Sequence, residues 1–371
     1  MKKVRFPLFK TLSALLSTIA AIGITGILAF YILIIAGASE KLQTLWVCTA
    51  MTTMDHQYLA TLFIPEETIN TIMDANRVDD SQHDSIILNF NKQENKPAET
   101  TPADTPEPDQ SGKDEKPSEQ KPAVPTEPDY ISEGYEQLEE GVFLKAVSGS
   151  GWKGYVMLID DPMRVKLVDT SKQYTCGENV MTMVEQSGAV AGINGGGFQD
   201  GANYDSNGGM PAGLLIEDRQ LIYPYHADNT TIYNMIGING NGALVLRHCT
   251  SQWALDNDIV SAVTFQPFLV VNGEGLIKNG TGGWGLAPRT AIGQRETGEI
   301  LFLVVDGRQV DWSIGCDLDV LQEVMLAEKA FNAAMLDGGS STAMVHGSTY
   351  INRPSLGHER WINNAFVVMP K

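Results

Sequence analysis

The sequence predicts an α+β protein: a mixed, mainly antiparallel β-sheet domain with a few packed helices, preceded by one transmembrane helix and a disordered linker. Three features of the sequence indicate this arrangement. An apolar run without charges covers residues 12–38, a proline-rich acidic stretch covers 91–128, and short apolar segments separated by turn residues recur from 130 to 371. Many short strands with few helices are typical of the α+β class.

The apolar run is long enough to cross a membrane. Its 27 residues exceed the ~20 that a transmembrane helix needs. Lys2, Lys3 and Arg5 precede it and Glu40 follows it, so the positive-inside rule places the N-terminus in the cytoplasm. We expect a single-pass protein of the cell membrane, anchored through 12–38, with an extracellular C-terminal domain. Ala36-Gly37-Ala38 also fits a signal-peptide cleavage site, and cleavage stays an alternative.

Four parts of the chain differ in composition. We expect residues 1–40 to hold the cytoplasmic N-terminus and the anchor, and 41–90 to form a membrane-proximal helical stalk, with Pro65-Glu66-Glu67 starting one helix. Residues 91–128 contain eight prolines and no aromatic residue, a composition that cannot bury enough apolar surface to fold. Residues 130–371 form the extracytoplasmic domain.

Charge and cysteine content exclude some functions. The net charge is −19, and residues 129–371 carry 15 basic and 28 acidic residues. Such a domain repels nucleic-acid phosphates, so we expect no nucleic-acid partner. Cys48, Cys176, Cys249 and Cys316 form no C-x-x-C pair, which leaves both free thiols and one or two disulfides open. The histidines show no zinc-ligand spacing.

Alternating and continuous apolar patterns predict the elements of the domain. Helices are expected at 178–186 and at 318–333, the second with Asp317 as its N-cap. Strands are expected at 155–159, 164–169, 190–194, 212–217, 220–223, 236–246, 268–272, 291–294, 299–306 and 334–336.

Three glycine-rich polar segments directly follow predicted strands. They are Asn194-Gly195-Gly196-Gly197-Phe198, Asp306-Gly307-Arg308 and Asp337-Gly338-Gly339-Ser340-Ser341-Thr342. Glycines let backbone N–H groups converge on an anion such as phosphate, and the carboxylates beside them suit a nucleophile, a general base or a cation ligand. Each segment alone also fits an ordinary turn. Paired acidic groups leave a divalent cation such as Ca²⁺ open, although no ligand spacing supports one.

These segments, together with Pro288-Arg289-Thr290-Ala291-Ile292-Gly293, Asn352-Arg353-Pro354-Ser355, Arg360 and Asn363-Asn364-Ala365, resemble the ordered motifs of the phosphodiester glycosidase family. The resemblance covers roughly 145–370. It departs from the family pattern at Gly197, which lengthens the first glycine run, and at the two-glycine Asp337 motif, which often has three.

The resemblance implies a hydrolase that cleaves sugar 1-phosphodiester linkages of the N-acetylhexosamine 1-phosphate type in envelope glycans or exopolysaccharide. The implied catalytic residues are Asp306, Asp337 and Arg308. The implied substrate-binding residues are Asn194, Gly195, Gly196, Arg289, Gly338, Gly339, Ser340, Ser341, Thr342, Arg353 and Asn364. Arginine suits phosphate because its planar fork donates two hydrogen bonds at once. A non-catalytic envelope glycan-binding module is the alternative.

Overall fold

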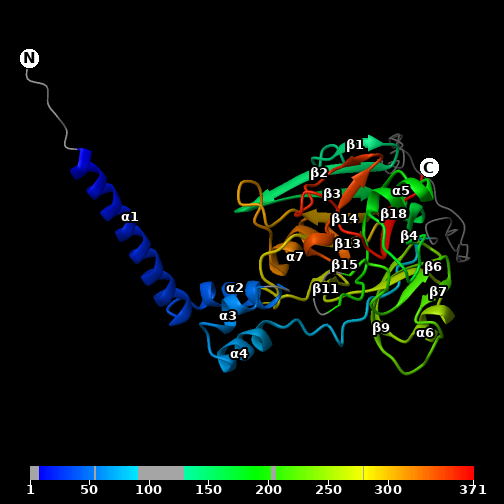
Figure 1. Ribbon diagram of the computed structural model, residues 1–371. Coiled ribbons are helices and arrows are strands. Elements are labelled where there is room, and N and C mark those ends of the chain that lie inside the picture. Colours follow the sequence, from blue (N-terminus) through cyan, green and yellow to red (C-terminus); the bar gives the residue numbers. More distant parts are fainter. Residues whose placement is uncertain (1–7, 54–55, 91–128, 202–205, 279) are drawn as a thin grey trace, which may run out of the picture.

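The computed structural model describes residues 8–53, 56–90, 129–201, 206–278 and 280–371. The linker expected at 91–128 lies outside the described residues. Figure 1 shows a long N-terminal helix standing away from a β-rich body, with short helices between them. The predicted α+β class is confirmed, and every strand pair in the described part of the chain is antiparallel.

The N-terminal helix has the length and composition of a membrane span. Helix α1 (Leu8–Phe30) continues into a π-helical turn (Tyr31–Ile35). Within it, Thr11–Ile35 is a 25-residue candidate span of which none is buried in the protein. This one helix is compatible with an anchor and with a signal sequence.

Three short helices follow: α2 (Glu40–Met51), α3 (Tyr58–Thr61) and α4 (Glu66–Asn76). Ser39 caps α2 by accepting a hydrogen bond from Leu42 N. Val47, Ala50, Ala60, Ile64 and Ile69 form a small core between them. Beyond Asn76 the chain has no helix or strand up to residue 89 and runs along the β-rich body, as the light-blue segment of Figure 1 shows.

The β-rich body contains three sheets. The eight-stranded sheet has the order β1-β2-β3-β14-β13-β15-β11-β12, and the two five-stranded sheets have the orders β7-β6-β10-β8-β9 and β17-β16-β5-β18-β4. The strands of the first sheet are β1 (Glu136–Glu139), β2 (Val142–Gly149), β3 (Trp152–Ile159), β14 (Ile300–Val305), β13 (Arg289–Arg295), β15 (Ala330–Met335), β11 (Phe268–Val271) and β12 (Glu274–Gly275). Those of the second are β7 (Gln220–Tyr223), β6 (Leu215–Glu217), β10 (Ile259–Thr264), β8 (Tyr233–Asn239) and β9 (Leu244–Cys249). Those of the third are β17 (Thr349–Tyr350), β16 (Met344–His346), β5 (Ala191–Asn194), β18 (Asn364–Val368) and β4 (Val165–Asp169).

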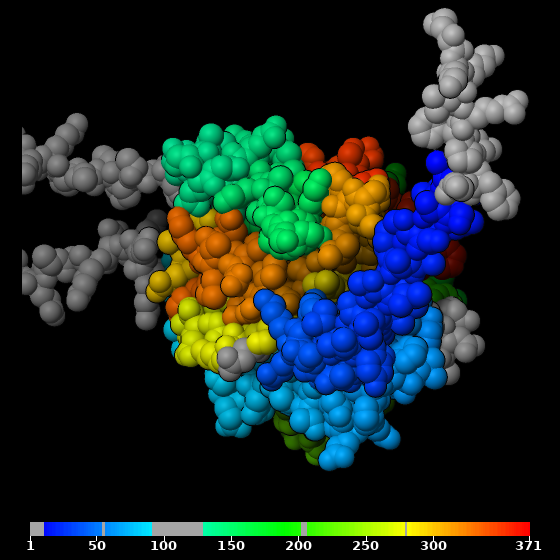
Figure 2. Space-filling model, turned by 90° about the vertical axis from the view of Figure 1, so that its left-hand side faces the viewer, coloured from blue at the N-terminus to red at the C-terminus, as the bar shows by residue number. Residues whose placement is uncertain are grey.

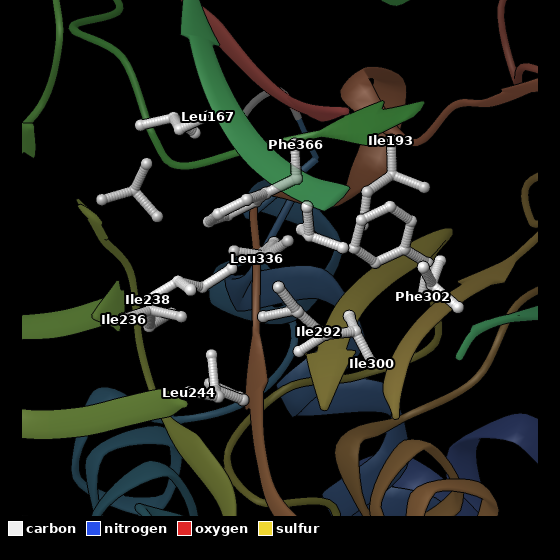
Figure 3. Close-up of a cluster of buried hydrophobic side chains, with 14 of the residues drawn as sticks. Leu167, Ile193, Ile236, Ile238, Leu244, Ile292, Ile300, Phe302, Leu336 and Phe366 are labelled. Carbon is white, nitrogen blue, oxygen red and sulfur yellow. The ribbon is translucent and has the colours of Figure 1, made fainter. Parts of the chain in front are cut away.

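One apolar core joins the three sheets. Figure 3 shows Ile292, Phe302 and Leu336 meeting Ile236 and Leu244 of the second sheet and Ile193 and Phe366 of the third. All seven side chains are fully buried. Because β14 is covered on both faces, its sequence Ile300–Val305 is continuously apolar instead of alternating.

Helices α5 (Val180–Ser187), α6 (Ser251–Asp256) and α7 (Leu318–Ala327) cover outer faces of the sheets. The predicted N-cap is confirmed, because Asp317 accepts a hydrogen bond from Val320 N. The helix expected at 318–333 is too long by six residues, since α7 ends at Ala327. Lys329 takes a left-handed φ of 65°, which stops the helix, and β15 begins at Ala330.

Candidate active site

The ends of five strands meet where two sheets join. In the first sheet, Arg289 at the start of β13 lies opposite Val305 at the end of β14, and Ala291 lies opposite Met335 at the end of β15. In the third sheet, Ala365 at the start of β18 pairs with Asn194 at the end of β5. A backbone hydrogen bond of 3.1 Å from Asp337 N to Gly195 O connects the two sheets. The antiparallel register thereby gathers all three glycine-rich segments.

Asn194 supports this junction from inside. Its side chain is fully buried. Its Oδ1 accepts hydrogen bonds from Thr290 Oγ1 at 2.8 Å and Ala343 N at 3.1 Å, and its Nδ2 donates to Asp337 O at 2.5 Å. Every polar atom of the amide is therefore used within the protein, which favours a positioning role for Asn194.

Asn364 holds the glycine loop in the same way. Its Oδ1 accepts a hydrogen bond of 2.8 Å from Gly196 N. A Cβ atom added at Gly195 would lie 2.1 Å from that same Oδ1, so only glycine fits there. At Gly196 an added Cβ would lie 2.6 Å from Val263 Cβ. The first two glycines of the motif are thus required by close packing.

Asp306 is buried and fully hydrogen-bonded. Its Oδ1 accepts from Asn352 Nδ2 at 3.0 Å and from Arg353 N at 2.9 Å, and its Oδ2 accepts from Trp312 Nε1 at 2.8 Å. The side chain is 1% exposed. With three donors already bound, this carboxylate is arranged to hold its neighbours.

Those neighbours form a cationic surface on an aromatic ring. The guanidinium carbon of Arg353 lies 4.8 Å from the centre of the Trp312 ring, and Lys153 Nζ lies 3.7 Å from it. Arg353 is exposed. Two cations over one ring form a surface that attracts an anion such as phosphate.

Asp337 differs from Asp306 in its surroundings, because its carboxyl accepts hydrogen bonds from Ser341 and from the Gly338 backbone next to it. Burial raises its pKa to about 6, against the opposing effects of a hydrogen bond from Ser341 and the charge of Arg360. The residue is still partly exposed. A carboxyl with a pKa near neutrality at a partly open position has the properties of a catalytic acid, base or nucleophile.

Arg308 extends next to this carboxyl. A Cβ atom at Gly339 would lie 3.2 Å from Arg308 Nη2, and the charge of Asp337 opposes the desolvation that lowers the pKa of Arg308. Its guanidinium group makes no hydrogen bond to another described residue. Arg308 as a whole residue is exposed, and its backbone has a φ of 61°. A strained backbone holding an unengaged cation is frequent at functional sites.

The remaining predicted residues divide into two groups. Gly338, Gly339 and Ser340 are partly exposed around Asp337, whereas Ser341 and Thr342 are buried. Arg289 is 2% exposed, donates from Nε to Cys316 O at 3.2 Å and from Nη2 to Gly285 O, and lies against the Trp284 ring. Burial lowers its pKa to about 10. Arg289 therefore supports the loop beneath the site.

Two residues that contribute to this region, Asp200 and Trp312, are not among those predicted from the sequence. Asp200 Oδ1 accepts a hydrogen bond of 2.5 Å from Arg360 Nη2, and the Arg360 guanidinium covers the Phe198 ring at 4.7 Å. Trp312 lies six residues after Asp306 and was also unassigned. The available signals were an acidic residue two positions after Phe198 and an aromatic residue close to the Asp306-Gly307-Arg308 turn.

The four cysteines are unpaired, and the described part of the chain has no group of three or more His, Cys, Asp or Glu side chains placed to hold a metal ion. The divalent cation stays an untested prediction.

Comparison with known proteins concerns the same part of the chain. A model of the phosphodiester glycosidase family matches residues 187–369, a range that contains every candidate site residue. The SPbeta prophage-derived uncharacterized protein YomE of Bacillus subtilis is 28% identical over 212 residues, which cover 55% of this chain and 32% of YomE. The chain thus spans about a third of that relative.

Among solved structures, the fold is similar to the zebrafish N-acetylglucosamine-1-phosphodiester alpha-N-acetylglucosaminidase catalytic domain, which is auto-inhibited by its pro-peptide. The TM-score is 0.52 at 22% identity, covering 62% of this chain and 82% of that one. This likeness concerns the fold, and the match to the family model shows that the part of the chain from 187 to 369 belongs to the phosphodiester glycosidase family.

Proposed function

We propose that the C-terminal domain hydrolyses the bond between the anomeric carbon of an N-acetylhexosamine and the oxygen of a phosphodiester. The observation that carries the proposal is the pair formed by Asp337, whose pKa is about 6, and the unengaged Arg308 beside it. Membership of the phosphodiester glycosidase family supports the same reaction.

The reaction requires two kinds of group. A carboxylate must act at the anomeric carbon, either by attacking it or by activating water, and cations must stabilise the leaving phosphate. Asp337 is assigned the first task, and Arg308 and Arg353 the second. The C1–O bond breaks, its electron pair leaves with the phosphate monoester, and water supplies the hydroxyl at C1. Because the second pKa of a phosphate monoester is near 6, the leaving group needs little help from a general acid.

Asp306 is assigned a positioning role in this scheme. Its carboxylate orients the backbone of Arg353 and the ring of Trp312, on which the Arg353 guanidinium lies. Asn194 and Asn364 hold the glycine-rich segments, and Arg289 holds the loop beneath the site through Cys316 O and Gly285 O. Gly338, Gly339 and Ser340 offer polar groups to the sugar or the phosphate.

We further propose that the apolar N-terminal helix anchors the protein in the cell membrane, with the domain outside acting on envelope glycans or exopolysaccharide. The 25-residue unburied span supports an anchor, and the basic residues that precede it support this orientation.

The test uses the full-length protein in detergent and a simple alkyl diester of N-acetylglucosamine 1-phosphate, with release of free sugar as the readout. Asp337→Asn is expected to lower kcat by about 10²–10⁴-fold without changing the fold. Asp258→Asn is the matched control, since Asp258 is an exposed aspartate paired with Arg219 away from the site. If the wild-type protein binds the diester but releases no sugar, the non-catalytic glycan-binding module is the better description.

A further inference from the structure

Three tyrosines form a cluster on the surface next to the candidate active site. The ring centres of Tyr174 and Tyr225 are 5.2 Å apart, and those of Tyr223 and Tyr225 are 5.6 Å apart. Tyr225 is 61% exposed and Tyr174 is 36% exposed. We name Tyr174, Tyr223 and Tyr225 the tyrosine platform. Its exposed ring faces are apolar. Exposed apolar clusters of this kind commonly mark a binding site for a ligand or another protein.

The rings are held in place by the backbone. Tyr174 Oη donates a hydrogen bond of 2.6 Å to Ile222 O, and Tyr174 N donates one of 3.1 Å to Gly209 O. Tyr174 also has a φ of 61°, a conformation that side-chain-bearing residues rarely adopt. Two hydrogen bonds and a strained backbone conformation therefore hold the Tyr174 ring rigidly in place.

The platform is continuous with the site through Gln199. The Nε2 atom of Gln199 donates to Tyr223 Oη at 3.3 Å and to Pro211 O at 3.0 Å. In the sequence, Gln199 lies between Phe198 and Asp200. The Arg360 guanidinium lies over the Phe198 ring and donates a hydrogen bond to Asp200. Arg360 in turn affects the charge of Asp337. These contacts thus join the tyrosines through Gln199 to the segment that holds Arg360, whose charge acts on the reacting carboxyl.

We propose that the tyrosine platform binds sugar rings of a glycan whose phosphodiester linkage lies at Asp337. The C–H face of a neutral sugar stacks on an aromatic ring, and tyrosine provides a rigid amphipathic surface for it. The cations Arg308 and Arg353 belong to the other loops of the site, so the phosphate and the saccharide have separate surfaces. This inference rests on the proposed function and specifies its substrate as an extended saccharide instead of a single sugar phosphate.

The experiment measures binding to the full-length protein by calorimetry, with the N-acetylglucosamine hexamer and the monosaccharide as probes. Wild-type protein is expected to bind the hexamer at least tenfold more tightly than the monosaccharide. Tyr225→Ala and Tyr174→Ala are expected to abolish that difference. Tyr58→Ala is the matched control, because Tyr58 is 51% exposed on α3.

Two results overturn the proposal. One is a hexamer that binds no more tightly than the monosaccharide, and the other is an equal loss in the Tyr58→Ala variant. Hydrolysis of the simple phosphodiester is measured in the same variants and should stay within about twofold of wild type. If the wild-type protein does not hydrolyse the simple phosphodiester, the proposed function is contradicted. The comparison of hexamer and monosaccharide binding still tests the tyrosine platform separately.

A second inference comes from the contacts of residues 77–90, which we name the strap. Asp80 is 8% exposed and Ser85 is 4% exposed. The strap follows α4 and lies along the β-rich body (Figure 1). Polar side chains in a segment without helix or strand normally face water, so their burial indicates a specific interface.

The strap covers the free edge of β9. Leu246 N donates to Ser85 Oγ at 2.9 Å, Ser85 N donates to Leu246 O at 2.8 Å, and His248 N donates to Asp84 Oδ1 at 2.9 Å. Phe268 N, at the start of β11, donates to Asp80 Oδ2 at 2.9 Å. Exposed strand edges promote aggregation, and proteins cover them. The strap therefore satisfies backbone groups that the body alone leaves unpaired.

The short helices add a second contact area. Leu286 N donates to Thr49 Oγ1 at 3.1 Å, and Thr281 N donates to Asn76 Oδ1 at 3.3 Å. A Cβ atom at Gly285 would lie 2.1 Å from Thr49 Cα, so α2 lies directly on this loop. Figure 2 shows the blue helices packed against the yellow and orange surface of the body.

We infer that residues 40–90 and 129–371 fold as one unit held by non-covalent contacts, so that the body stays at the membrane when the chain between them is cut. The test inserts a site-specific protease sequence within 91–128 and cuts the protein in isolated membranes. The C-terminal fragment is expected to sediment with the membranes.

The variant carrying Asp80→Ala and Ser85→Ala is expected to release the fragment after the same cut, whereas Asp79→Ala, an exposed neighbour, is the control and should retain it. Immediate release of the wild-type fragment would refute the inference. If the fragment of the double variant also stays with the membranes, the strap contributes nothing to holding the body there.

Discussion

Asn352 donates a hydrogen bond of 3.0 Å from Nδ2 to Asp306 Oδ1 and thereby ties the end of β14 to the segment that carries Arg353. The backbone N of Arg353 donates to the same oxygen. The backbone of Arg353 is therefore positioned by a buried carboxylate that already accepts three hydrogen bonds. This relationship separates the two aspartates that the sequence motifs present as equivalent.

Asp306→Asn should destabilise the protein as well as lower activity. Three N–H donors surround the carboxylate, and an asparagine NH₂ must face at least one of them. Such a donor–donor contact in a buried position costs about 1–3 kcal/mol. The measurement is the urea unfolding midpoint together with kcat/KM. An unchanged midpoint with lost activity would indicate that Asp306 acts directly on the substrate.

The pH dependence should identify Asp337 as the ionised group. Burial raises its pKa from 3.8 to about 6, so log kcat/KM should rise with a slope near one below pH 6 and level off above it. Asp337→Asn should remove this limb from the residual activity. A wild-type profile that is flat between pH 4.5 and 7 would contradict the assignment.

Ionisation of Asp337 should lower the stability of the protein, whereas it should raise the activity. A raised carboxyl pKa means that the folded state holds the proton more tightly than the unfolded state. The stability gained from protonated Asp337 is complete below pH 3.8 and is lost as the pH rises through about 6. The melting temperature of Asp337→Asn minus that of wild type should therefore increase from pH 4 to pH 7, as thermal unfolding measures.

Arg308→Lys should weaken substrate binding with little effect on stability. Lysine keeps the charge but loses the two-pronged guanidinium contact with phosphate, so KM should rise about tenfold, or ~1.4 kcal/mol. Arg219→Lys is a close control, since Arg219 is also an exposed arginine with a positive φ of 65°. Equal effects of the two variants would place the loss in the backbone instead of in phosphate recognition.

The sequence predicted the local features well because they depend on neighbouring residues. Asp317 was identified as an N-cap, and each glycine-rich segment was placed at the end of a strand. The carboxylates Asp306 and Asp337 could not be distinguished, since their difference arises from Trp312, Asn352 and Arg360, which come from other segments. The end of α7 was missed because the left-handed turn occurs at Lys329, a residue type that does not signal it.

For a related reason, the sequence does not predict that residues 77–90 pack on the β-rich body. Asp80, Asp84 and Ser85 have the composition of a solvated stalk, and their partners lie more than 150 residues away, at Leu246, His248 and Phe268. Local patterns reveal the face that an element buries but not which distant backbone groups need a partner.

Truncation should reveal the contribution of residues 40–90 to folding. A protein that begins at residue 129 leaves the buried N–H groups of Leu246 and Phe268 without the acceptors Ser85 and Asp80, each a loss of about 1–3 kcal/mol. It also lacks Val78, which packs against the main core, so the core surface that Val78 covers becomes exposed. We expect its melting temperature to lie well below that of a protein that begins at residue 40 and lacks only the apolar helix. Differential scanning calorimetry of the two purified proteins provides the comparison. Equal melting temperatures would show that the body is complete without the strap and that the contacts along β9 are incidental to its stability.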